Sequence, residues 1–422
     1  MSFDNHAPEP LTIEERTETV VPDLPTEDIT ALSEISAVRV TMRDGVPTIE
    51  AGNHVGVIGL PTGRLLQIRP KVECNLLYYL AFAGRLDEDL VSDRDASFVT
   101  GDSFVDLLGR LFLSELRQIV RRGLHKEYRT RQSDEGYIRG QLEFTKQIQR
   151  HGPRSTQFAC RYDELTHDIP INQVLYQATD VLLGLVSDID LRRDLRQYHG
   201  EIQRKVSEQA TLPRPTEIQL TRLNDHYAPI LQLAELIFDR QFIEDVGIGH
   251  QRFQSLLIDT EVLFEHVVYR GVELAVKSLS YLVRGDGNPR GSGETCIGHL
   301  LTDTDENPIQ RLEPDFFLRD QSDNQIVLVG DAKWKDTTRP SREDLYQLTA
   351  YQSRLEVPGL LVYPDLSGRI NANYEQRRQP QEGNQPQQLR VTELQTTGAT
   401  DYESFKKEIK DLCRTEIQRL LQ

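Results

Sequence analysis

The chain has 422 residues, enough for two or three domains that each bury a core, and its formal net charge is −17. Its four cysteines form no CxxC pair and have no neighbouring histidine pair at zinc-ligand spacing, which excludes a disulfide-stapled scaffold and a zinc finger. The sequence shows no secretion signal and no apolar run of about 18 residues, so a soluble, cytoplasmic protein is expected.

The acidic balance bears on the choice of partner. A DNA enzyme normally carries a basic surface, yet acidic residues number 66 against 49 basic ones, of which only 10 are lysines. This pattern is typical of proteins from a very salty cytoplasm, where the Debye length at about 1 M salt is only about 3 Å. The charge therefore indicates a halophilic habitat. The alternative, an acidic protein that avoids nucleic acid, stays open on charge alone.

The N-terminal third divides into two predicted parts. Residues 1–30 contain eight acids, four prolines and the single basic residue Arg16, which predicts an acidic, partly disordered lead-in. Residues 31–100 begin with short alternating apolar runs separated by Asp-Gly, Gly-Asn and Pro-Thr-Gly turn signals. They predict a β-rich N-terminal domain.

Residues 101–250 change to helical spacing, as in FVDLLGRLFLSELRQIV, and predict a mainly helical middle region. Within it, residues 110–150 carry ten basic and five acidic residues. The basic side chains form a possible phosphate-facing stripe, from which Arg121, Arg122 and Arg129 are the candidate DNA contacts. A helix face paired with acidic residues explains the same pattern equally well.

Residues 251–422 interleave predicted helices and strands, which indicates an α/β domain with a mixed sheet within a multidomain α+β protein. Two of the strands, LEPDFFLRD and QIVLVGDAKWK, flank the turn-rich segment QSDNQ and predict an antiparallel hairpin. The Gly-rich stretch at 285–293 lacks a GK[ST] ending and is interpreted as a surface loop.

The hairpin brings two carboxylates together. If it is centred on Asp323, paired residue numbers sum to 646, so Asp320 faces Ile326 and Asp315 faces Asp331. Directly opposed Cβ atoms are about 4.5–5.5 Å apart, so both acids could ligate one Mg²⁺. Without a cation the two carboxylates would repel each other.

Lys333 joins this pair, because residues two apart on a strand point to the same face. An ammonium beside two metal-binding acids can stabilise the charge of a pentavalent phosphate or position an attacking water. The alternative is a solvated salt-bridge cluster. Against it, VLVG is a continuous apolar run of the kind found in interior strands, and α/β sheets keep their sites at such strand ends.

The spacing EPD, fifteen residues, then DAKWK resembles the PD-(D/E)xK signature of restriction and repair nucleases. In the following segment Ser341 is a predicted helix cap, and Asp344, Gln347 and Tyr351 lie on one helix face. The resemblance implies a catalytic role for Gln347, as part of a QxxxY pattern, and a DNA contact by Tyr351. It also implies that Glu265 is a further metal-oriented acid, whose alternative is a helix-surface residue.

Most of the chain resembles one family, McrC, the nuclease subunit that accompanies the McrB GTPase in modification-dependent restriction. The resemblance is carried by VGVIGLPTGRLLQIRPKV, by YIRGQLEFTKQ with FACRYDELTHDIPINQVL, and by LFE, PDFFL, GDAKWK and DLYQLTAY. It implies a Mg²⁺-dependent endonuclease that cuts double-stranded, 5-methylcytosine-type modified DNA in antiviral defence. The implied partner is a McrB-like AAA+ GTPase ring, which docks on the N-terminal and middle regions.

The sequence contains no GxxxxGK[ST], so a partner must supply any nucleotide hydrolysis. Two rivals stay open: a non-catalytic adaptor of the motor and a stand-alone repair or recombination nuclease. A second polar cluster in CRYDELTHDIPIN is interpreted as a capped turn that leads into the helix from Asn172.

Overall fold

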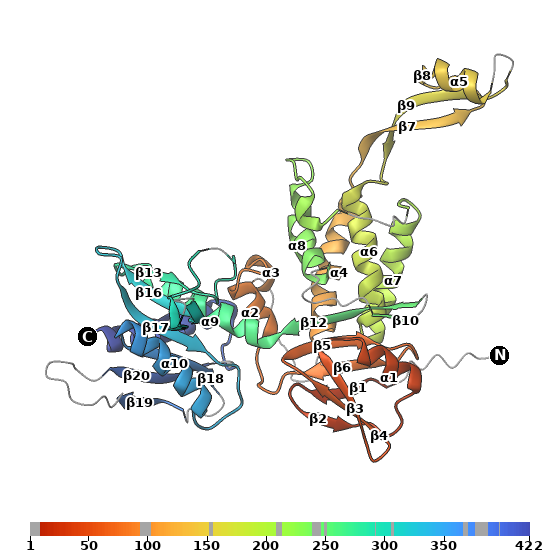
Figure 1. Cartoon of the computed structure of the whole chain (residues 1–422). Helices are drawn as coiled ribbons and strands as arrows, with labels where there is room; N and C mark the ends of the chain where they lie inside the picture. Colours follow the sequence, from red (N-terminus) through yellow and green to blue (C-terminus); the bar gives the residue numbers. More distant parts are fainter. Residues whose placement is uncertain are drawn as a thin grey trace. The chain divides into compact units, whose positions relative to one another are not determined.

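The computed structural model divides the chain into two compact units: Val105–Asp239 forms one, and Met1–Phe104 together with Arg240–Gln422 forms the other (Figure 1). The structure describes residues 9–92, 103–151, 155–207, 213–238, 246–248, 251–291, 293–304, 308–365, 370–375, 387–395 and 397–422. None of the helices in these ranges is long and apolar enough to cross a membrane.

Two small sheets share a core in the N-terminal part. The first has the order β1-β6-β5-β12, and the second has the order β2-β4-β3. Together with helix α1 (Thr26–Ser33) they bury an apolar cluster that includes Leu32, Ile49 and Leu66. The strands are β1 (Leu11–Glu14), β2 (Glu18–Val20), β3 (Val38–Arg43), β4 (Val46–Ala51), β5 (His54–Gly59), β6 (Leu65–Arg69) and β12 (Ser255–Asp259).

The predicted lead-in is wrong from residue 11 onward. Residues 11–33 form β1, β2 and α1, and Ile13, Val21 and Leu24 are buried in the shared core. Their burial offsets the entropy of ordering an acidic segment, each large side chain contributing roughly 1.5–3 kcal/mol. Residues 1–8 of the lead-in lie outside the described residues.

Strand β12 returns to the N-terminal sheet from far along the chain. It pairs antiparallel with β5, and Leu256, Leu257 and Ile258 are at most 2% exposed. Helix α9 (Thr260–Val276) begins at the next residue. Strand β12, which belongs to the segment predicted as the C-terminal domain, is therefore part of the N-terminal sheet.

The middle unit combines helices with a β-ribbon. Its main helices are α4 (Phe104–Arg122), α6 (Pro170–Leu185), α7 (Ile189–Gln203) and α8 (Ala228–Phe238). The ribbon has the order β7-β9-β8, and helix α5 follows β8 at its tip (Figure 1). Its elements are β7 (Glu127–Glu135), β8 (Gln141–Leu142), α5 (Phe144–Arg150) and β9 (Phe158–Thr166).

The C-terminal part is built on a six-stranded mixed sheet with the order β13-β16-β17-β18-β20-β19. Strands β17, β18 and β20 are parallel, and the remaining pairs are antiparallel, so the predicted mixed sheet is confirmed. The strands are β13 (Tyr281–Arg284), β16 (Phe316–Asp320), β17 (Ile326–Ala332), β18 (Gly359–Pro364), β19 (Ala372–Glu375) and β20 (Gln388–Leu394).

Helices cover both faces of this sheet. Helix α10 (Arg342–Leu355) packs Leu348 and Tyr351 against Phe317, Val329 and Leu361. Helix α11 (Tyr402–Leu421) contacts α9 and lies against the other face, where Glu416 pairs with the buried Arg390 of β20. The short elements are α2 (Leu76–Phe82), α3 (Asp89–Ser92), η1 (Pro215–Glu217), η2 (Asp225–Tyr227), β10 (Val246–Ile248), β11 (Gln251–Phe253), β14 (His299–Thr302) and β15 (Pro308–Arg311).

The predicted hairpin register is confirmed where it matters for the carboxylates. Phe316 faces Gly330, Phe317 faces Val329 and Leu318 faces Leu328, so the numbers sum to 646. Beyond Leu318 a bulge shifts the register. The expected pair of Asp320 with Ile326 is therefore wrong.

The turn chemistry explains this shift. Arg319 faces Ile326 instead, and the backbone N–H of Asp320 donates to the carbonyl of Gln325 at 2.9 Å. The Asp320 carboxylate is used in the turn, where it accepts hydrogen bonds from the backbone and hydroxyl of Ser322. This local Asx-type turn competes with a continuous ladder.

Candidate active site

Asp315 and Asp331 lie at the same edge of the six-stranded sheet. Asp331 is near the end of β17, and Asp315 immediately precedes β16, which runs antiparallel to β17. Asp331 is 1% exposed and Asp315 is 8% exposed. An oxygen of Asp315 accepts a hydrogen bond of 2.6 Å from the backbone N–H of Ala332, which ties the two strand ends together.

Lys333 extends from the same edge. Its Nζ lies 2.5 Å from an oxygen of Asp331, and its backbone N–H donates to Val362 of β18 at 2.9 Å. Burial alone would lower the pKa of Lys333, but the carboxylates of Asp331 and Asp315 outweigh it and raise this pKa. The structure thus brings together the three residues that the sequence pattern singled out.

The carboxylates are under electrostatic strain. Burial raises the pKa of Asp331, and burial together with the neighbouring Asp331 raises the pKa of Asp315 well above its usual value. The oxygens of Asp331 interact with Lys333 and Asp315 and form no hydrogen bond to any other described residue. Buried carboxylate oxygens with so few partners, beside a second carboxylate, are a donor set that suits a hard divalent cation.

Glu265 faces this pair from α9. It interacts electrostatically with Asp331 and Lys333, and burial, followed by the charges of Glu261 and Asp331, raises the pKa of Glu265 to about 8. Within the described part of the chain no three His, Cys, Asp or Glu side chains converge closely enough to form a metal cluster. The set is therefore two close carboxylates with a third nearby, and Mg²⁺ is commonly held by only one or two carboxylates plus water and substrate.

Helix α10 carries Gln347 and Tyr351, and Tyr351 interacts electrostatically with Asp331 and Asp315. Ser341 caps the helix as predicted, because its side chain accepts a hydrogen bond from the backbone N–H of Asp344. Gln347 donates to the Tyr351 hydroxyl at 2.8 Å, and this hydroxyl donates to the carbonyl of Glu313. Tyr351 is only 5% exposed. Its burial does not fit the expected DNA contact and instead makes it a support for Gln347.

The two lysines of DAKWK have different partners. Lys335 donates to Asp344 at 2.6 Å, and Asp344 also accepts a hydrogen bond from the hydroxyl of Tyr363. Although burial acts in the opposite direction, these partners hold the pKa of Asp344 below its usual value. Lys335 therefore joins β17 to α10, whereas Lys333 faces the carboxylate pair. Strict alternation would direct both lysines to the same face. They differ because β17 ends at Ala332 and the chain turns, the backbone N–H of Lys335 donating to the carbonyl of Lys333 at 3.1 Å.

The Gly-rich loop after β13 contacts the backbone at Asp315, a role that the sequence interpretation missed. The backbone N–H of Gly287 donates to the Asp315 carbonyl at 3.0 Å, and that of Asp286 donates to Pro314 at 3.1 Å. Gly285 has a φ of +142°, and a Cβ there would lie 2.3 Å from the Asp315 carbonyl oxygen. The G-x-G spacing was visible in the sequence, but its partner was not.

We expect Gly285→Ala to destabilise the fold by about 1–3 kcal/mol, because the added carbon overlaps the Asp315 backbone. Thermal melting measures this loss. Gly291→Ala is the matched control: Gly291 also has a positive φ, of +58°, but a Cβ there would meet no atom within 4 Å. Equal melting temperatures for the two variants would contradict the close packing of Gly285 on Asp315.

The candidate DNA-contacting arginines belong to the other unit. Arg121 and Arg122 end α4, whereas Arg129 lies on β7, so the three are divided between a helix and the ribbon. Other members of the basic stretch are paired: Arg110 with Asp188, Arg117 with Asp194 and Arg131 with Glu164. The alternative of a paired helix face thus holds for part of the stretch.

The second polar cluster makes structural contacts, but the expected cap before Asn172 is wrong, because α6 begins at Pro170 and its N-cap, Ile169, makes no side-chain cap hydrogen bond. Asp168 accepts hydrogen bonds from Gln173 and from the backbone of Ser207. Asn172 is fully buried and donates to the carbonyls of His125 and His167. These contacts hold the start of α6 against its neighbours.

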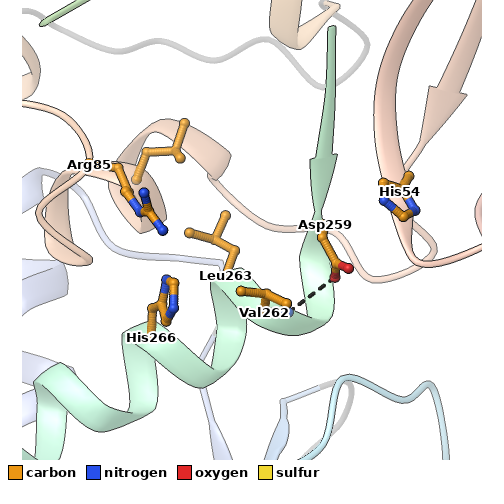
Figure 2. Close-up of a pocket in the computed structure, with 7 residues that line it drawn as sticks. His54, Arg85, Asp259, Val262, Leu263 and His266 are labelled. Atoms are coloured by element: carbon orange, nitrogen blue, oxygen red, sulfur yellow. Dashed lines mark hydrogen bonds between the residues drawn. The ribbon is translucent and has the colours of Figure 1, made fainter. Parts of the chain in front are cut away.

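A pocket of about 280 Å³ lies beside the first turns of α9 (Figure 2). Arg85 and His266 point toward one another in it, and burial, followed by the charge of Arg85, lowers the pKa of His266 to about 4. This imidazole is therefore neutral near pH 7. The pocket is lined by His54, Leu80, Arg85, Asp259, Val262, Leu263 and His266.

Comparison with known proteins adds family information to this geometry. Residues 49–364 match the sequence pattern of the family described as McrBC 5-methylcytosine restriction system component. The chain is 23% identical over 323 residues to the type IV methyl-directed restriction enzyme EcoKMcrBC of Escherichia coli K12, a match that covers 71% of this chain and 88% of that protein.

The fold also matches a chain in a solved half-complex from a tetradecameric assembly of Thermococcus gammatolerans McrB AAA+ hexamers with bound McrC. The TM-score is 0.60 at 17% identity, and the match covers 95% of this chain and 99% of the other. The matched residues include β5, β6 and β12 of the N-terminal part, the middle unit, and β16 and β17 together with Asp315 and Asp331. The chain therefore belongs to the family of McrBC 5-methylcytosine restriction system components.

Proposed function

We propose that this chain is the DNA-cutting subunit of its restriction system and that it hydrolyses phosphodiester bonds at a Mg²⁺-dependent centre of the PD-(D/E)xK type. The observation that carries the proposal is the convergence of Asp315, Asp331 and Lys333 at one sheet edge, where the oxygens of Asp331 are buried and otherwise unpartnered. A purely structural ion pair would leave no reason for a second buried carboxylate beside it.

The residues have separate roles in this proposal. Asp315 and Asp331 would hold the cation, with Glu265 as a third acid close enough to orient a bound water. When bound, Mg²⁺ would lower the pKa of a water molecule and offset charge on the scissile phosphate. Lys333 would stabilise the additional negative charge that develops on the phosphate in the transition state. Gln347, held by Tyr351, would orient the substrate or water.

The experiment that tests this function is linearisation of a methylated plasmid by the chain together with a McrB-like AAA+ GTPase, GTP and Mg²⁺. Cleavage that disappears when Mg²⁺ is chelated supports the proposal. Stimulated GTP turnover without any cleavage would favour the adaptor function instead. Cleavage by the chain alone, without partner or GTP, would favour a stand-alone nuclease.

We infer that the β-ribbon of the middle unit contributes to docking on the AAA+ ring. Large apolar side chains are exposed on it: Tyr128, Tyr137, Ile138, Phe144, Ile148 and Leu165 are each 49–74% exposed. Phe144 and Ile148 are four residues apart on α5 and share one face of that helix. Exposed apolar clusters of this kind mark protein interaction surfaces.

Replacing Phe144 and Ile148 by serine is expected to weaken partner binding and stimulated GTP turnover by at least about tenfold, because both side chains lose apolar contact with the ring. The melting temperature should not change, since exposed substitutions rarely alter stability by more than about 0.5 kcal/mol. Ile189→Ser is the control, at an apolar residue of the same unit that is 78% exposed on α7. Unchanged binding by the double variant would exclude this surface.

We propose that DNA is guided by those members of the basic stretch for which no ion pair is seen among the described residues. Replacing Arg121, Arg122 and Arg129 by glutamine should weaken cleavage alike at every sequence, because phosphate contacts carry no sequence information. The slope of DNA affinity against salt should fall by about one for each lost phosphate contact. An unchanged slope with lost partner binding would identify the stretch as part of the ring-docking surface.

A further inference from the structure

A buried carboxylate in the N-terminal part accepts hydrogen bonds from three other segments of the chain. Glu15, which follows β1, is 1% exposed. One of its oxygens accepts hydrogen bonds from the backbone of Lys71 at 3.0 Å and from Trp334 Nε1 at 2.9 Å. The other accepts a hydrogen bond of 2.6 Å from the hydroxyl of Thr260. Glu15 therefore joins the N-terminal sheet, the start of α9 and the segment after β17.

Trp334 is the residue next to Lys333, so whatever fixes its indole also fixes the backbone from which Lys333 extends. The indole is 2% exposed and packs with ring-centroid distances of 5.3 Å to Phe264 and 6.2 Å to Tyr79. Lys333 and Trp334 follow the last residue of β17, and their side chains have different partners: Lys333 pairs with Asp331, whereas Trp334 donates to Glu15. The indole is anchored to Glu15, which leaves the lysine directed to the carboxylate pair.

The neighbouring residue strengthens the same connection. Arg16 donates to Asn53 at 2.5 Å and pairs with Glu261 at 3.1 Å. Asn53 also hydrogen-bonds Glu261, and its carbonyl accepts the backbone N–H of Thr260 at 2.8 Å. Asp259 caps the same helix end, as Figure 2 shows. Glu261 lies one turn before Glu265, so this network fixes the helix that presents the third acid.

We propose that Glu15 and Trp334 are positioning residues for the cleavage centre, so that the N-terminal segment of this chain holds Lys333 and Asp331 in their working geometry. This inference rests on the proposed nuclease function. Nothing in it requires Glu15 or Trp334 to touch DNA or metal: both act through the backbone at the end of β17. A displacement of about 1 Å at a reacting group can lower a rate by about a hundredfold.

The variants separate positioning from simple stability. In Trp334→Phe the ring is kept and the N–H that binds Glu15 is removed. In Glu15→Gln all three contacts can be kept. The amide oxygen can accept from Trp334 and Lys71. The amide N–H can donate to the Thr260 hydroxyl oxygen, while that hydroxyl donates to the Asn53 carbonyl. Thr62→Val is the matched control, since it removes one of the two donors to Asp28, another fully buried carboxylate of the same unit.

Two readouts are measured on the full chain with its AAA+ partner. The first is plasmid cleavage as a function of DNA concentration. The expected result for Trp334→Phe is a kcat at least about tenfold lower with an unchanged KM and unchanged GTP turnover, because only the cutting geometry is disturbed. Glu15→Gln and Thr62→Val should cleave at close to the wild-type rate.

The second readout uses the fluorescence of Trp334, the only tryptophan of the chain. Its emission should move to longer wavelength in Glu15→Ala and should stay unchanged in Glu15→Gln and Thr62→Val. Cleavage by Trp334→Phe at the rate of Thr62→Val, or an unchanged emission in Glu15→Ala, would overturn this inference but not the proposed function. A wild-type chain that does not cleave would overturn the proposed function itself.

Discussion

Replacing Asp331 by asparagine is expected to abolish DNA cleavage and to leave the melting temperature unchanged or higher. The neutral amide would remove one of the two carboxylates that we propose hold Mg²⁺. It also removes a buried charge. The pKa values of Asp331 and Asp315 are raised in the folded chain, so the folded chain binds protons more tightly than the unfolded chain. Stability is therefore lost as pH rises from the usual carboxyl pKa to the raised pKa values of the folded chain.

Plasmid cleavage and thermal melting near neutral pH should be measured on the same preparation. Asp323→Asn is the matched control, since Asp323 lies exposed in the turn of the same hairpin and binds only the backbone of Gln325 among the hydrogen bonds observed there. Mg²⁺ should raise the melting temperature of the wild type more than that of Asp331→Asn. At a hundredfold excess over Kd the expected stabilisation is about 2.7 kcal/mol. Full cleavage by Asp331→Asn would refute the site.

Lys333→Ala is expected to lower the cleavage rate by about a hundredfold, equivalent to about 3 kcal/mol, without weakening DNA or partner binding. The ammonium is held 2.5 Å from Asp331 before substrate arrives, so in the proposed reaction it would act as a preorganised charge at the phosphate. An interaction of this kind is realised in the transition state and appears in turnover.

Lys335→Ala is the control that separates the loss of a proposed catalytic charge in Lys333→Ala from the loss of any lysine in the same segment. Lys335 pairs with Asp344 on α10, and its loss leaves a carboxylate that is 3% exposed without its cation. This variant should lose melting temperature with a smaller loss of rate than Lys333→Ala. Single-turnover cleavage, DNA binding and melting should be measured for both. Equal losses of binding and rate in Lys333→Ala would contradict its assignment.

The hairpin could be predicted from the sequence because its information is local. A turn-rich QSDNQ between two apolar runs defines the register, and the period of two along β17 places Asp331 and Lys333 together. The same local reasoning failed at Asp320, where side-chain hydrogen bonds to Ser322 compete with the ladder and produce a bulge. Ser341, Gln347 and Tyr351 were found from helix capping and spacing, but the burial of Tyr351 depends on the sheet beneath it.

The rest of the site depends on contacts between distant segments. Glu15 and Trp334 are separated by 319 residues. Strand β12 pairs with β5, although the whole middle unit lies between these two strands in the sequence. Neither the apolar run in SLLID nor the composition of residues 1–30 identifies the partner strand. The partner of the Gly285 loop could not be predicted either. The glycine spacing indicates that another backbone segment lies close, but it does not identify that segment as Asp315.

The division of roles between this chain and its partner is tested most directly in one reconstituted reaction. Chain, McrB-like AAA+ GTPase, GTP, Mg²⁺ and methylated plasmid are combined, and GTP turnover and plasmid linearisation are recorded in the same tube. With Asp331→Asn, GTP turnover should continue at the wild-type rate while linear product is absent. Linear product at the wild-type rate with Asp331→Asn would show that the DNA is cut elsewhere and would contradict the account.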